Sequence, residues 1–245
     1  MCLPPFFIEL TLMNIVITGA SKGFGKALAE KFASAGHDLY VCSRNAVALY
    51  KTVDEILTRF PNITVKAKPF DLSIKEQARE FGHWILQFGI SIDVLINNAG
   101  SFLPGSVHNE EEGVLEKMIE VNLYSAYHLT RTLVPKMMLQ KSGHIFNMCS
   151  IASLQPYNNG GAYSISKFAL AGFSKNLREE MKPHGIKVTT LYPGAALTDS
   201  WAGSNIDPKR IMEASDIAEM VYASTRLSPQ ACPEEIIIRP QLGDL

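Results

Sequence analysis

The sequence predicts a single-domain α/β protein of the doubly wound Rossmann type, with about seven parallel strands and helices on both faces of the sheet. Short β-branched runs alternate with longer segments of helical period almost to the end of the chain. Several runs, such as 15–18 (IVIT) and 94–97 (VLIN), are continuously apolar, as in strands that are covered on both faces. The length of 245 residues, without a visible linker, fits one large domain.

The expected strands alternate with helical segments along the chain. The strands are Asn14–Thr18, Asp38–Ser43, Thr64–Lys68, Ile92–Asn97, His144–Cys149, Lys187–Leu191 and Glu235–Arg239. A first helix is expected to end at Gly36 and to bury a stripe of residues at helical spacing. That stripe is Ala27, Leu28, Lys31, Phe32 and Ala35. Long helical patterns also cover 114–139 and 162–181. In such a sheet, ligands bind beyond the carboxyl ends of the strands, so chemical groups are expected there.

Composition excludes several classes of protein and partner. With 47% hydrophobic and 19% charged residues, the chain is neither disordered nor fibrous. A formal net charge of −1 argues against nucleic acid and anionic membranes as partners. The four cysteines are scattered and lack zinc-site spacing, so we expect reduced thiols in a cytoplasmic protein and no metal. Residues 1–12 are an apolar leader of uncertain status, without signal-peptide features, and Met13 is an alternative start.

A glycine-rich turn follows the first strand and leads into the first helix. The run TGASKGFG places glycines at Gly19, Gly23 and Gly25, which departs from the spacing G-x-G-x-x-G. Such a turn lets a pyrophosphate approach backbone N–H groups at a helix N-terminus, although it can also be a packing device. Its place at the first β–α crossover favours a cofactor loop that includes Ser21, Lys22 and Phe24. A Walker A loop is excluded, because no Gly-Lys-Ser/Thr closes the segment.

The end of the second strand predicts the type of dinucleotide. An acidic residue at this point would hold an adenosine 2′-hydroxyl and repel a 2′-phosphate. The chain instead has Ser43 followed by Arg44, and Lys22 in the glycine-rich turn can reach the same place. Each cation alone could be an ordinary surface residue. Together they favour NADP(H) over NAD(H).

Two further strand ends carry polar residues. Asn97 and Asn98, followed by Ala99 and Gly100, could tie neighbouring strands together and leave room for a cofactor. Asp71, which precedes Leu72 after the third strand, could accept a hydrogen bond from an adenine amino group. It could equally cap the next helix, and the sequence leaves both alternatives open.

Ser150, Tyr163 and Lys167 form the strongest candidate catalytic group. Tyr163 and Lys167 are four residues apart at the start of a long helical pattern, so they share one face of the helix. A neighbouring ammonium is expected to lower the pKa of the tyrosine from about 10, which would help it to donate a proton to a carbonyl oxygen. Ser150, at the end of the fifth strand, could hydrogen-bond the same oxygen.

As a set, these motifs resemble the single-domain short-chain dehydrogenase/reductases, over residues 13–239. The resemblance rests on TGASKGFG, NNAG, a serine thirteen residues before the tyrosine, YSISK, and Pro-Gly followed by Thr. It implies that Ser150 stabilises the oxyanion and that Tyr163 is the acid–base catalyst. It implies that Lys167 adjusts the pKa of the tyrosine and binds the ribose, and that Asn122 supports a proton-relay water. It also implies that the 193–198 stretch covers the nicotinamide, through Pro193, Gly194, Ala196 and Thr198. A homodimer or homotetramer is implied as well, built on the long helices.

Substrate identity is the least determined property. Leu154, Tyr157 and Trp201 are expected to line a pocket for a small or medium carbonyl or alcohol. The tail is weakly similar to bacterial sepiapterin-reductase-like members, and Asp244 within it is expected to be exposed to solvent. The alternatives are a 3-oxoacyl-acyl-carrier-protein reductase and a non-catalytic NADPH-sensing protein on the same fold. An epimerase is disfavoured, because the 78 residues after Lys167 leave little room for a substrate domain.

Overall fold

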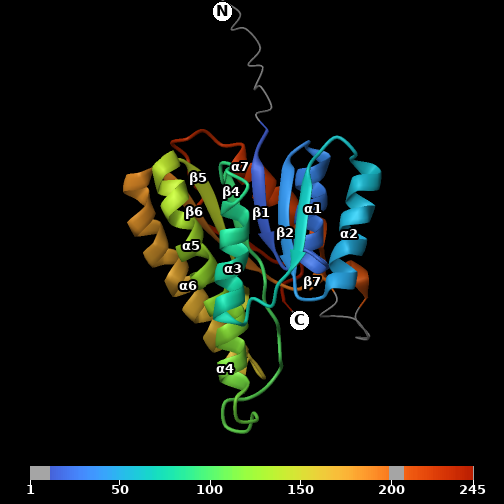
Figure 1. Cartoon of the computed structure of the whole chain (residues 1–245). Coiled ribbons are helices and arrows are strands. Elements are labelled where there is room, and N and C mark those ends of the chain that lie inside the picture. The colour runs from blue at the N-terminus through green and yellow to red at the C-terminus, as the bar shows by residue number, and fades with distance from the viewer. Residues whose placement is uncertain (1–11, 199–206, 245) are drawn as a thin grey trace, which may run out of the picture.

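A computed structural model describes residues 12–198 and 207–244, and it confirms the predicted architecture. Seven parallel strands form one sheet in the order β3-β2-β1-β4-β5-β6-β9 (Figure 1). The order reverses its direction between β1 and β4, which is where doubly wound sheets bind ligands. The strands are β1 (Asn14–Thr18), β2 (Asp38–Ser43), β3 (Val65–Pro69), β4 (Val94–Asn97), β5 (Gly143–Met148), β6 (Ile186–Pro193) and β9 (Glu235–Ile238).

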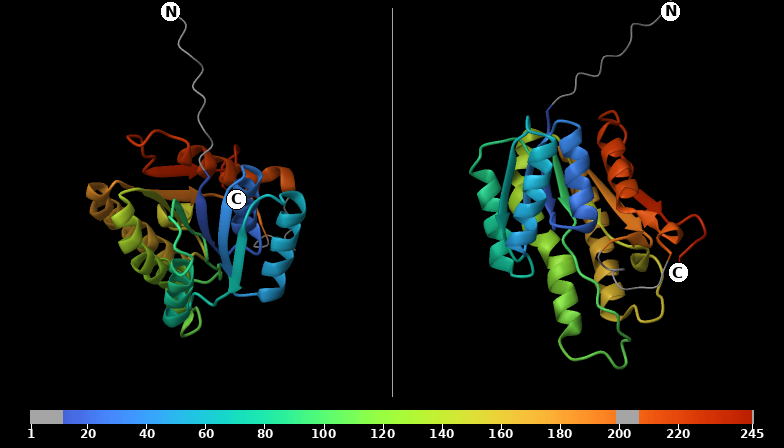
Figure 2. Two further views of the ribbon diagram at one scale, coloured as in Figure 1. Left: turned by 45° about the horizontal axis from the view of Figure 1, so that its top comes forward. Right: turned by 90° about the vertical axis from the view of Figure 1, so that its right-hand side faces the viewer.

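Helices cover both faces of the sheet (Figures 1 and 2). One face carries α1 (Gly23–Ser34), α2 (Ala46–Arg59) and α7 (Ala214–Thr225). The other carries α3 (Lys75–Leu86), α5 (Ser125–Gln140) and α6 (Gly161–Met181). A short helix, α4 (Val114–Ile119), continues through a π-helical turn at Glu120–Tyr124 into α5 and projects beyond the sheet (Figure 1). Within the described ranges, no helix is both long and apolar enough to cross a membrane.

The two layers of core explain the continuously apolar strands. Ile15 and Ile17 of β1 point into the cluster beneath α1, α2 and α7, whereas Val16 between them points into the cluster beneath α3, α5 and α6. All three are fully buried. Because successive side chains of a strand point to opposite faces, a strand covered on both sides has no polar alternation. The burial follows from the apolar run that the sequence shows.

Several predicted boundaries and one predicted helix face need correction. Only β1 and β2 have the expected limits, and the other strands shift by one or two residues. The sequence analysis missed a second, two-stranded sheet, formed by β7 (Ala196–Leu197) and β8 (Met212–Glu213). The buried face of α1 consists of Gly25, Leu28, Ala29, Phe32 and Ala33, so it is turned by one residue from the predicted stripe. Lys31 of that stripe instead pairs with Glu219 of α7.

His144 of β5 is a buried titratable group on the face of the sheet that α1, α2 and α7 cover, the same face as Phe146. Its ring stacks on that of Phe146, with the centroids 3.9 Å apart. Its Nε2 lies 2.7 Å from the hydroxyl oxygen of Thr189. Thr189 gives its own proton to the carbonyl of Pro233, so Nε2 of His144 is the donor. Burial lowers the pKa of His144 to about 3, and the residue therefore stays neutral in the fold.

This buried histidine predicts a loss of stability in mild acid. Between pH 6.5 and 3 the unfolded chain binds a proton at this residue and the folded chain does not, so the free energy of unfolding falls as the pH is lowered. From pH 7 to 5 we expect His144 to contribute a loss of about 2 kcal/mol. Urea unfolding at both pH values should show a shallower dependence for His144→Leu than for the exposed control His108→Leu. Equal pH dependence in the two variants would contradict the assignment.

Candidate active site

The glycine-rich turn brings β1 and α1 unusually close together. A Cβ atom at Gly25 would lie 2.1 Å from the carbonyl oxygen of Gly19, so no larger residue fits there without a backbone shift. Gly19 and Gly23 have φ of +68° and +52°, in the left-handed region that favours glycine. The N-cap residue of α1 is Lys22, whose side chain has no acceptor atom. The turn thus presents backbone N–H groups at a helix N-terminus, as an anion site requires.

The end of β2 lies against this turn. The hydroxyl oxygens of Ser21 and Ser43 are 2.7 Å apart, which draws the next residue of each segment, Lys22 and Arg44, to the same edge of the sheet. Both Lys22 and Arg44 are exposed. The Arg44 guanidinium lies 3.9 Å from a carboxylate oxygen of Asp71. Two cations therefore follow these serines as exposed residues, and their role toward a 2′-phosphate stays a prediction.

Asp71 is not the cap of the following helix. The N-cap residue of α3 is Ile74, so that alternative is wrong. Oδ1 of Asp71 accepts hydrogen bonds from the backbone N–H and the hydroxyl of Ser73, at 3.1 and 2.7 Å. Oδ2 faces Arg44. Leu72, directly after it, is buried beneath α3. The carboxylate thus belongs to the edge where the glycine-rich turn and β2 meet, and its role toward adenine stays a prediction.

The asparagines at the end of β4 tie the strands together as expected. Nδ2 of Asn98 donates to the carbonyl of Thr18, at 2.9 Å, and the Thr18 hydroxyl accepts from the N–H groups of Asn98 and Ala99. Nδ2 of Asn97 donates to Oδ1 of Asn147 on β5, also at 2.9 Å. Gly100 follows as an exposed residue. These bonds fix the carboxyl ends of β1, β4 and β5 relative to one another.

Ser150, Tyr163 and Lys167 come together at the carboxyl end of β5. The Ser150 side chain accepts from the N–H of Ala152, at 3.2 Å, and lies close enough to the Tyr163 hydroxyl to lower the pKa of the phenol. Nζ of Lys167 donates to the carbonyl of Met148, at 2.8 Å, and lies 5.8 Å from the centroid of the Tyr163 ring. Lys167 is almost fully buried, although it carries an amine. The sequence therefore identified the three groups that the fold assembles.

The pKa of Tyr163 differs from the expected direction. Burial raises it to about 12, against a smaller lowering by the Ser150 hydrogen bond. The ammonium of Lys167 was expected to dominate, but its Nζ is bound to the Met148 carbonyl rather than to the phenol. Burial also lowers the pKa of Lys167. Desolvation therefore outweighs the interaction between the two side chains in this structure.

Asn122 lies in the π-helical turn between α4 and α5, with its side chain buried. Its Oδ1 accepts from the N–H of Ser101, at 2.8 Å. Its Nδ2 donates to the Ser101 carbonyl and to the hydroxyl of Ser166, at 3.0 and 2.9 Å. Ser166 belongs to α6 and lies beside Lys167. The side chain thus joins three segments around the site, and π-helical turns of this kind are frequent at functional sites.

The 193–198 stretch closes the other side of the glycine-rich turn. A Cβ at Gly23 would lie 3.5 Å from Cβ of Thr198, so the two segments approach each other. Gly194 N–H donates to the carbonyl of Ile238 on β9, at 2.8 Å. Pro193 and Ala196 are buried. The stretch therefore lies where a bound dinucleotide would be covered, although that contact stays a prediction.

The C-terminal tail, residues 239–244, packs beside this stretch. One prediction about it is wrong. Asp244 was expected to be exposed, but its side chain is only 21% exposed and pairs with Arg239. Its Oδ1 would lie 2.7 Å from a Cβ at Gly194. The Arg210 guanidinium donates hydrogen bonds to the backbone carbonyls of Gly243 and Asp244 in the same tail. The similarity of the tail to sepiapterin-reductase-like members stays a prediction.

The surroundings of the Tyr163 ring were only partly foreseen. Tyr157 and Leu154 are 45% and 43% exposed, and Trp201 lies outside the described residues. Phe102, which the sequence analysis missed, contacts the Tyr163 ring edge to face, with the centroids 4.9 Å apart. Its position two residues after NNAG was the only available signal. The loop after β4 therefore contributes an aromatic wall to the site.

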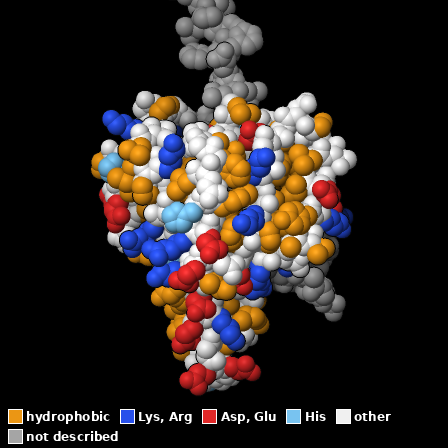
Figure 3. Space-filling model, viewed as in Figure 1, with side chains coloured by type: hydrophobic (Ala, Val, Ile, Leu, Met, Phe, Trp, Pro, Cys, Tyr) orange, Lys and Arg blue, Asp and Glu red, His pale blue; other side chains and the backbone are white. Residues whose placement is uncertain are grey.

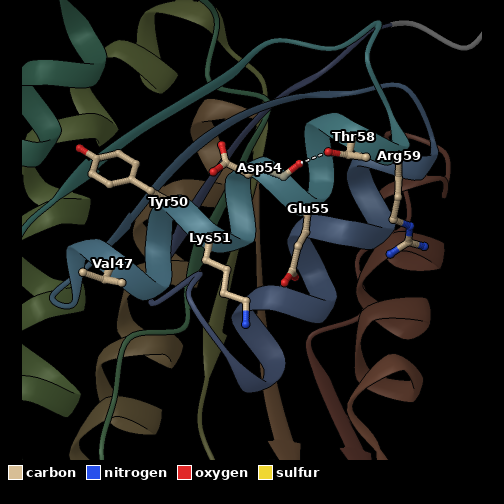
Figure 4. Close-up of a pocket in the computed structure, with 7 residues that line it drawn as sticks. All are labelled: Val47, Tyr50, Lys51, Asp54, Glu55, Thr58 and Arg59. Carbon is tan, nitrogen blue, oxygen red and sulfur yellow. Dashed lines mark hydrogen bonds between the residues drawn. The ribbon is translucent and has the colours of Figure 1, made fainter.

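Three other features, a hollow on α2, the metal-ligating residue types and the cysteines, were compared with this site. A shallow hollow on the outer face of α2 is lined by Val47, Tyr50, Lys51, Asp54, Glu55, Thr58 and Arg59 (Figure 4). None of these is a predicted site residue. In the described ranges, no three histidine, cysteine or acidic side chains are grouped to hold a metal ion. Cys42, Cys149 and Cys232 are free thiols, and burial raises the pKa of Cys149 to about 12.

Comparison with known proteins identifies the family. The family model described as short chain dehydrogenase matches residues 13–209. The chain belongs to this family. An uncharacterized oxidoreductase of Staphylococcus epidermidis is 30% identical over 230 residues, which are 92% of this chain and 96% of that protein. The short-chain dehydrogenases are oxidoreductases, and the predicted fold and family are confirmed.

Two solved structures are similar along almost the whole chain. One is an alcohol dehydrogenase from the archaeon Thermococcus sibiricus in complex with 5-hydroxy-NADP, with 26% identity, a TM-score of 0.86 and coverage of 94% of this chain and 97% of that one. The other is a metagenomic short-chain oxidoreductase in complex with NADP, with 30% identity, a TM-score of 0.81 and the same coverage of 94% and 97%. Both relatives thus carry NADP or a derivative of it.

The close approach at Gly25 predicts a cost in stability. Gly25→Ala places a methyl group 2.1 Å from the Gly19 carbonyl oxygen, so the turn must open. We expect a loss of about 1–3 kcal/mol in the free energy of unfolding, measured in urea. Gly172→Ala is the matched control, because a Cβ at this exposed position of α6 meets nothing within 4 Å. Equal stability of the two variants would show that the turn does not need glycine.

Proposed function

We propose that the protein is an NADP(H)-dependent oxidoreductase that transfers a hydride between the nicotinamide and a small or medium carbonyl or alcohol. The observation that carries this proposal is the convergence of Ser150, Tyr163 and Lys167 at the carboxyl end of β5, at the sheet edge that also bears the glycine-rich turn. The NADP complexes of the two structural relatives support it. The carbonyl-reductase direction and the substrate are part of the proposal.

The residues present fit a dinucleotide. The turn at Gly19, Gly23 and Gly25 leaves no room for a Cβ at its closest point and offers the N-terminus of α1 to a pyrophosphate. Lys22 and Arg44 would hold the 2′-phosphate, beside Ser21 and Ser43. The remaining cofactor contacts are proposed for Phe24, Asp71, Leu72, Asn98, Ala99, Gly100, Tyr163, Lys167, Pro193, Gly194, Ala196 and Thr198. When bound, the cofactor supplies the hydride.

The chain's own residues supply the proton and hold the oxygen. Tyr163 donates its phenolic proton to the carbonyl oxygen of the substrate, and the raised pKa keeps that proton in place at neutral pH. Ser150 donates a hydrogen bond to the same oxygen and stabilises the developing charge. Lys167, held on the Met148 carbonyl, stabilises the phenolate that results. Asn122 holds the Ser101 backbone and Ser166, so it supports the site from behind.

The loss of the Tyr163 hydroxyl is the first test of this function. A panel of diketones, quinones, oxoacyl thioesters and pterin ketones, followed by NADPH consumption, should identify a substrate. Tyr163→Phe keeps the ring and removes the proton, so we expect kcat to fall by about 10²-fold or more with near-normal NADPH binding. Tyr50→Phe, on the outer face of α2, should retain full activity. A wild-type rate in Tyr163→Phe would contradict the assignment.

Substitutions of Ser150 and of Lys167 should differ in their effects on catalysis and on cofactor binding. Ser150→Ala should cost roughly 2.7–4 kcal/mol in transition-state stabilisation and preserve cofactor affinity. Lys167→Ala should impair both kcat and NADPH binding. Reduction of oxoacyl thioesters alone would favour the 3-oxoacyl-acyl-carrier-protein reductase. If NADPH binds and no carbonyl is reduced, the non-catalytic NADPH-sensing alternative gains support.

Charge at the end of β2 should determine the choice of cofactor. We expect NADPH to bind more tightly than NADH, because Arg44 and Lys22 meet the 2′-phosphate. Arg44→Asp should shrink or invert this preference by about 1–3 kcal/mol, measured by fluorescence titration of both cofactors. Lys51→Asp makes the same charge change on the outer face of α2 (Figure 4) and should leave the preference nearly unchanged. Equal affinity of the wild type for both cofactors would refute the assignment.

We expect the chain to form a homodimer or homotetramer. A groove between α5 and α6 is lined largely by apolar and aromatic side chains, among them Leu123, Tyr124, Tyr127, Val134, Pro135 and Phe173. Surfaces of this kind commonly bury themselves against a second copy. Light scattering at micromolar concentration should give a multiple of the 27.0 kDa chain mass. A particle of 27.0 kDa would contradict the expectation.

A further inference from the structure

The helix that carries Tyr163 begins without a cap of its own. The N-cap residue of α6 is Gly160, which has no side chain to accept a hydrogen bond from the first turn. Tyr163 is the third residue of this helix, so the geometry of the first turn sets the direction of its ring. An uncapped first turn frays easily. Something else must hold this turn if the Tyr163 hydroxyl is to stay beside Ser150.

Glu110 supplies the missing acceptor from a distant loop. Its Oε2 accepts a hydrogen bond from the N–H of Ala162, at 3.1 Å, across 52 residues of sequence. A carboxylate at a helix N-terminus is also favoured by the helix dipole. Glu110 is partly buried, whereas its neighbours Glu111 and Glu112 are exposed. Figure 3 shows acidic side chains gathered on this projecting end of the molecule, and Glu110 differs from its exposed neighbours by its bond to α6.

The backbone is shaped to admit this contact. Gly161 has φ of +31°, and a Cβ there would lie 2.5 Å from the Gly105 carbonyl oxygen and 2.6 Å from Oε2 of Glu110. Gly105 N–H donates to the carbonyl of Asn159, and the Ser106 hydroxyl donates to its Oδ1, both at 3.1 Å. These two bonds and the Glu110–Ala162 bond form what we term the clasp. The clasp fastens the loop after β4 to the segment that precedes α6.

The loop held by the clasp also carries Phe102. Its ring contacts the Tyr163 ring at 84°, with the centroids 4.9 Å apart. Phe102 is 40% exposed, so one part of the ring faces Tyr163 and another faces solvent. If the clasp opens, the first turn of α6 and the Phe102 wall lose their common anchor. The first turn of α6, which carries Tyr163, and the Phe102 ring that contacts Tyr163 therefore both depend on the Glu110 carboxylate.

We infer that Glu110 is a positioning residue for the reaction, because it caps α6 from another loop and so fixes Tyr163 and Phe102 relative to each other. The inference rests on the proposed function of Tyr163 as proton donor. Glu110 acts as a hydrogen-bond acceptor, and Gln can keep that role through its amide oxygen. The three variants Glu110→Ala, Glu110→Gln and Glu111→Ala therefore separate acceptor, charge and background effects.

Hydrogen exchange tests the clasp without reference to activity. The N–H of Ala162 should exchange about fivefold faster in Glu110→Ala than in the wild type, and at the wild-type rate in Glu111→Ala. Glu110→Gln should stay close to the wild type. If Glu110→Ala does not fold, Glu110→Asp, whose carboxylate is one methylene shorter, should give an intermediate increase. Unchanged exchange in every Glu110 variant would overturn the clasp, whether or not a carbonyl substrate is known.

Kinetics then tests the positioning role on a carbonyl that the wild type reduces. Glu110→Ala should lower kcat by about 10- to 100-fold and change the Kd for NADPH less than twofold, because misplaced reacting groups cost rate rather than cofactor affinity. Glu110→Gln should restore kcat, and Glu111→Ala should match the wild type. Wild-type kcat in Glu110→Ala, or equal loss in Glu110→Gln, would overturn the inference. Lack of carbonyl reduction by the wild type itself would instead count against the proposed function.

Discussion

The placement of the site depends on a short chain of hydrogen bonds between buried side chains. Asn97 of β4 donates to Asn147 of β5, Asn147 donates to Ser174 of α6, and the Ser174 hydroxyl meets that of Thr190 on β6 at 2.6 Å. A buried polar group without a partner costs about 1–3 kcal/mol, so these residues tolerate only one arrangement of the strands and helix. The helix fixed in this way carries Tyr163.

Around this chain of hydrogen bonds, the shape of the site depends on close approach between backbone segments. Glycine allows α1 to touch β1 at Gly25 and lets the loop after β4 touch α6 at Gly161. The same tight packing desolvates Tyr163 and Lys167, and it moves their pKa values away from the charged forms. A buried phenol that keeps its proton suits a group that gives the proton only when negative charge develops beside it.

The sequence allowed most of the fold to be predicted, because its signals were local. Apolar runs, glycine turns and strand-end polar residues each report on their own neighbourhood, and the parallel topology then brings the strand ends together. Burial and long-range contact have no such local signal. The pairing of Glu110 with Ala162, the contacts of Asn122 and the raised pKa of Tyr163 all arise from segments far apart in the chain. The four-residue spacing of Tyr163 and Lys167 placed them on one face, but it could not show that Lys167 points to a carbonyl.

The central claim is that this edge of the sheet transfers a hydride from NADPH to a carbonyl carbon. NADPH carrying deuterium at both positions of the nicotinamide C4 tests it most directly, with mass spectrometry and NMR of the alcohol formed in ordinary water. The account predicts one deuterium on the carbinol carbon of each product molecule and an unlabelled hydroxyl group. A product without deuterium at that carbon would contradict it, because the hydrogen would then have come from solvent.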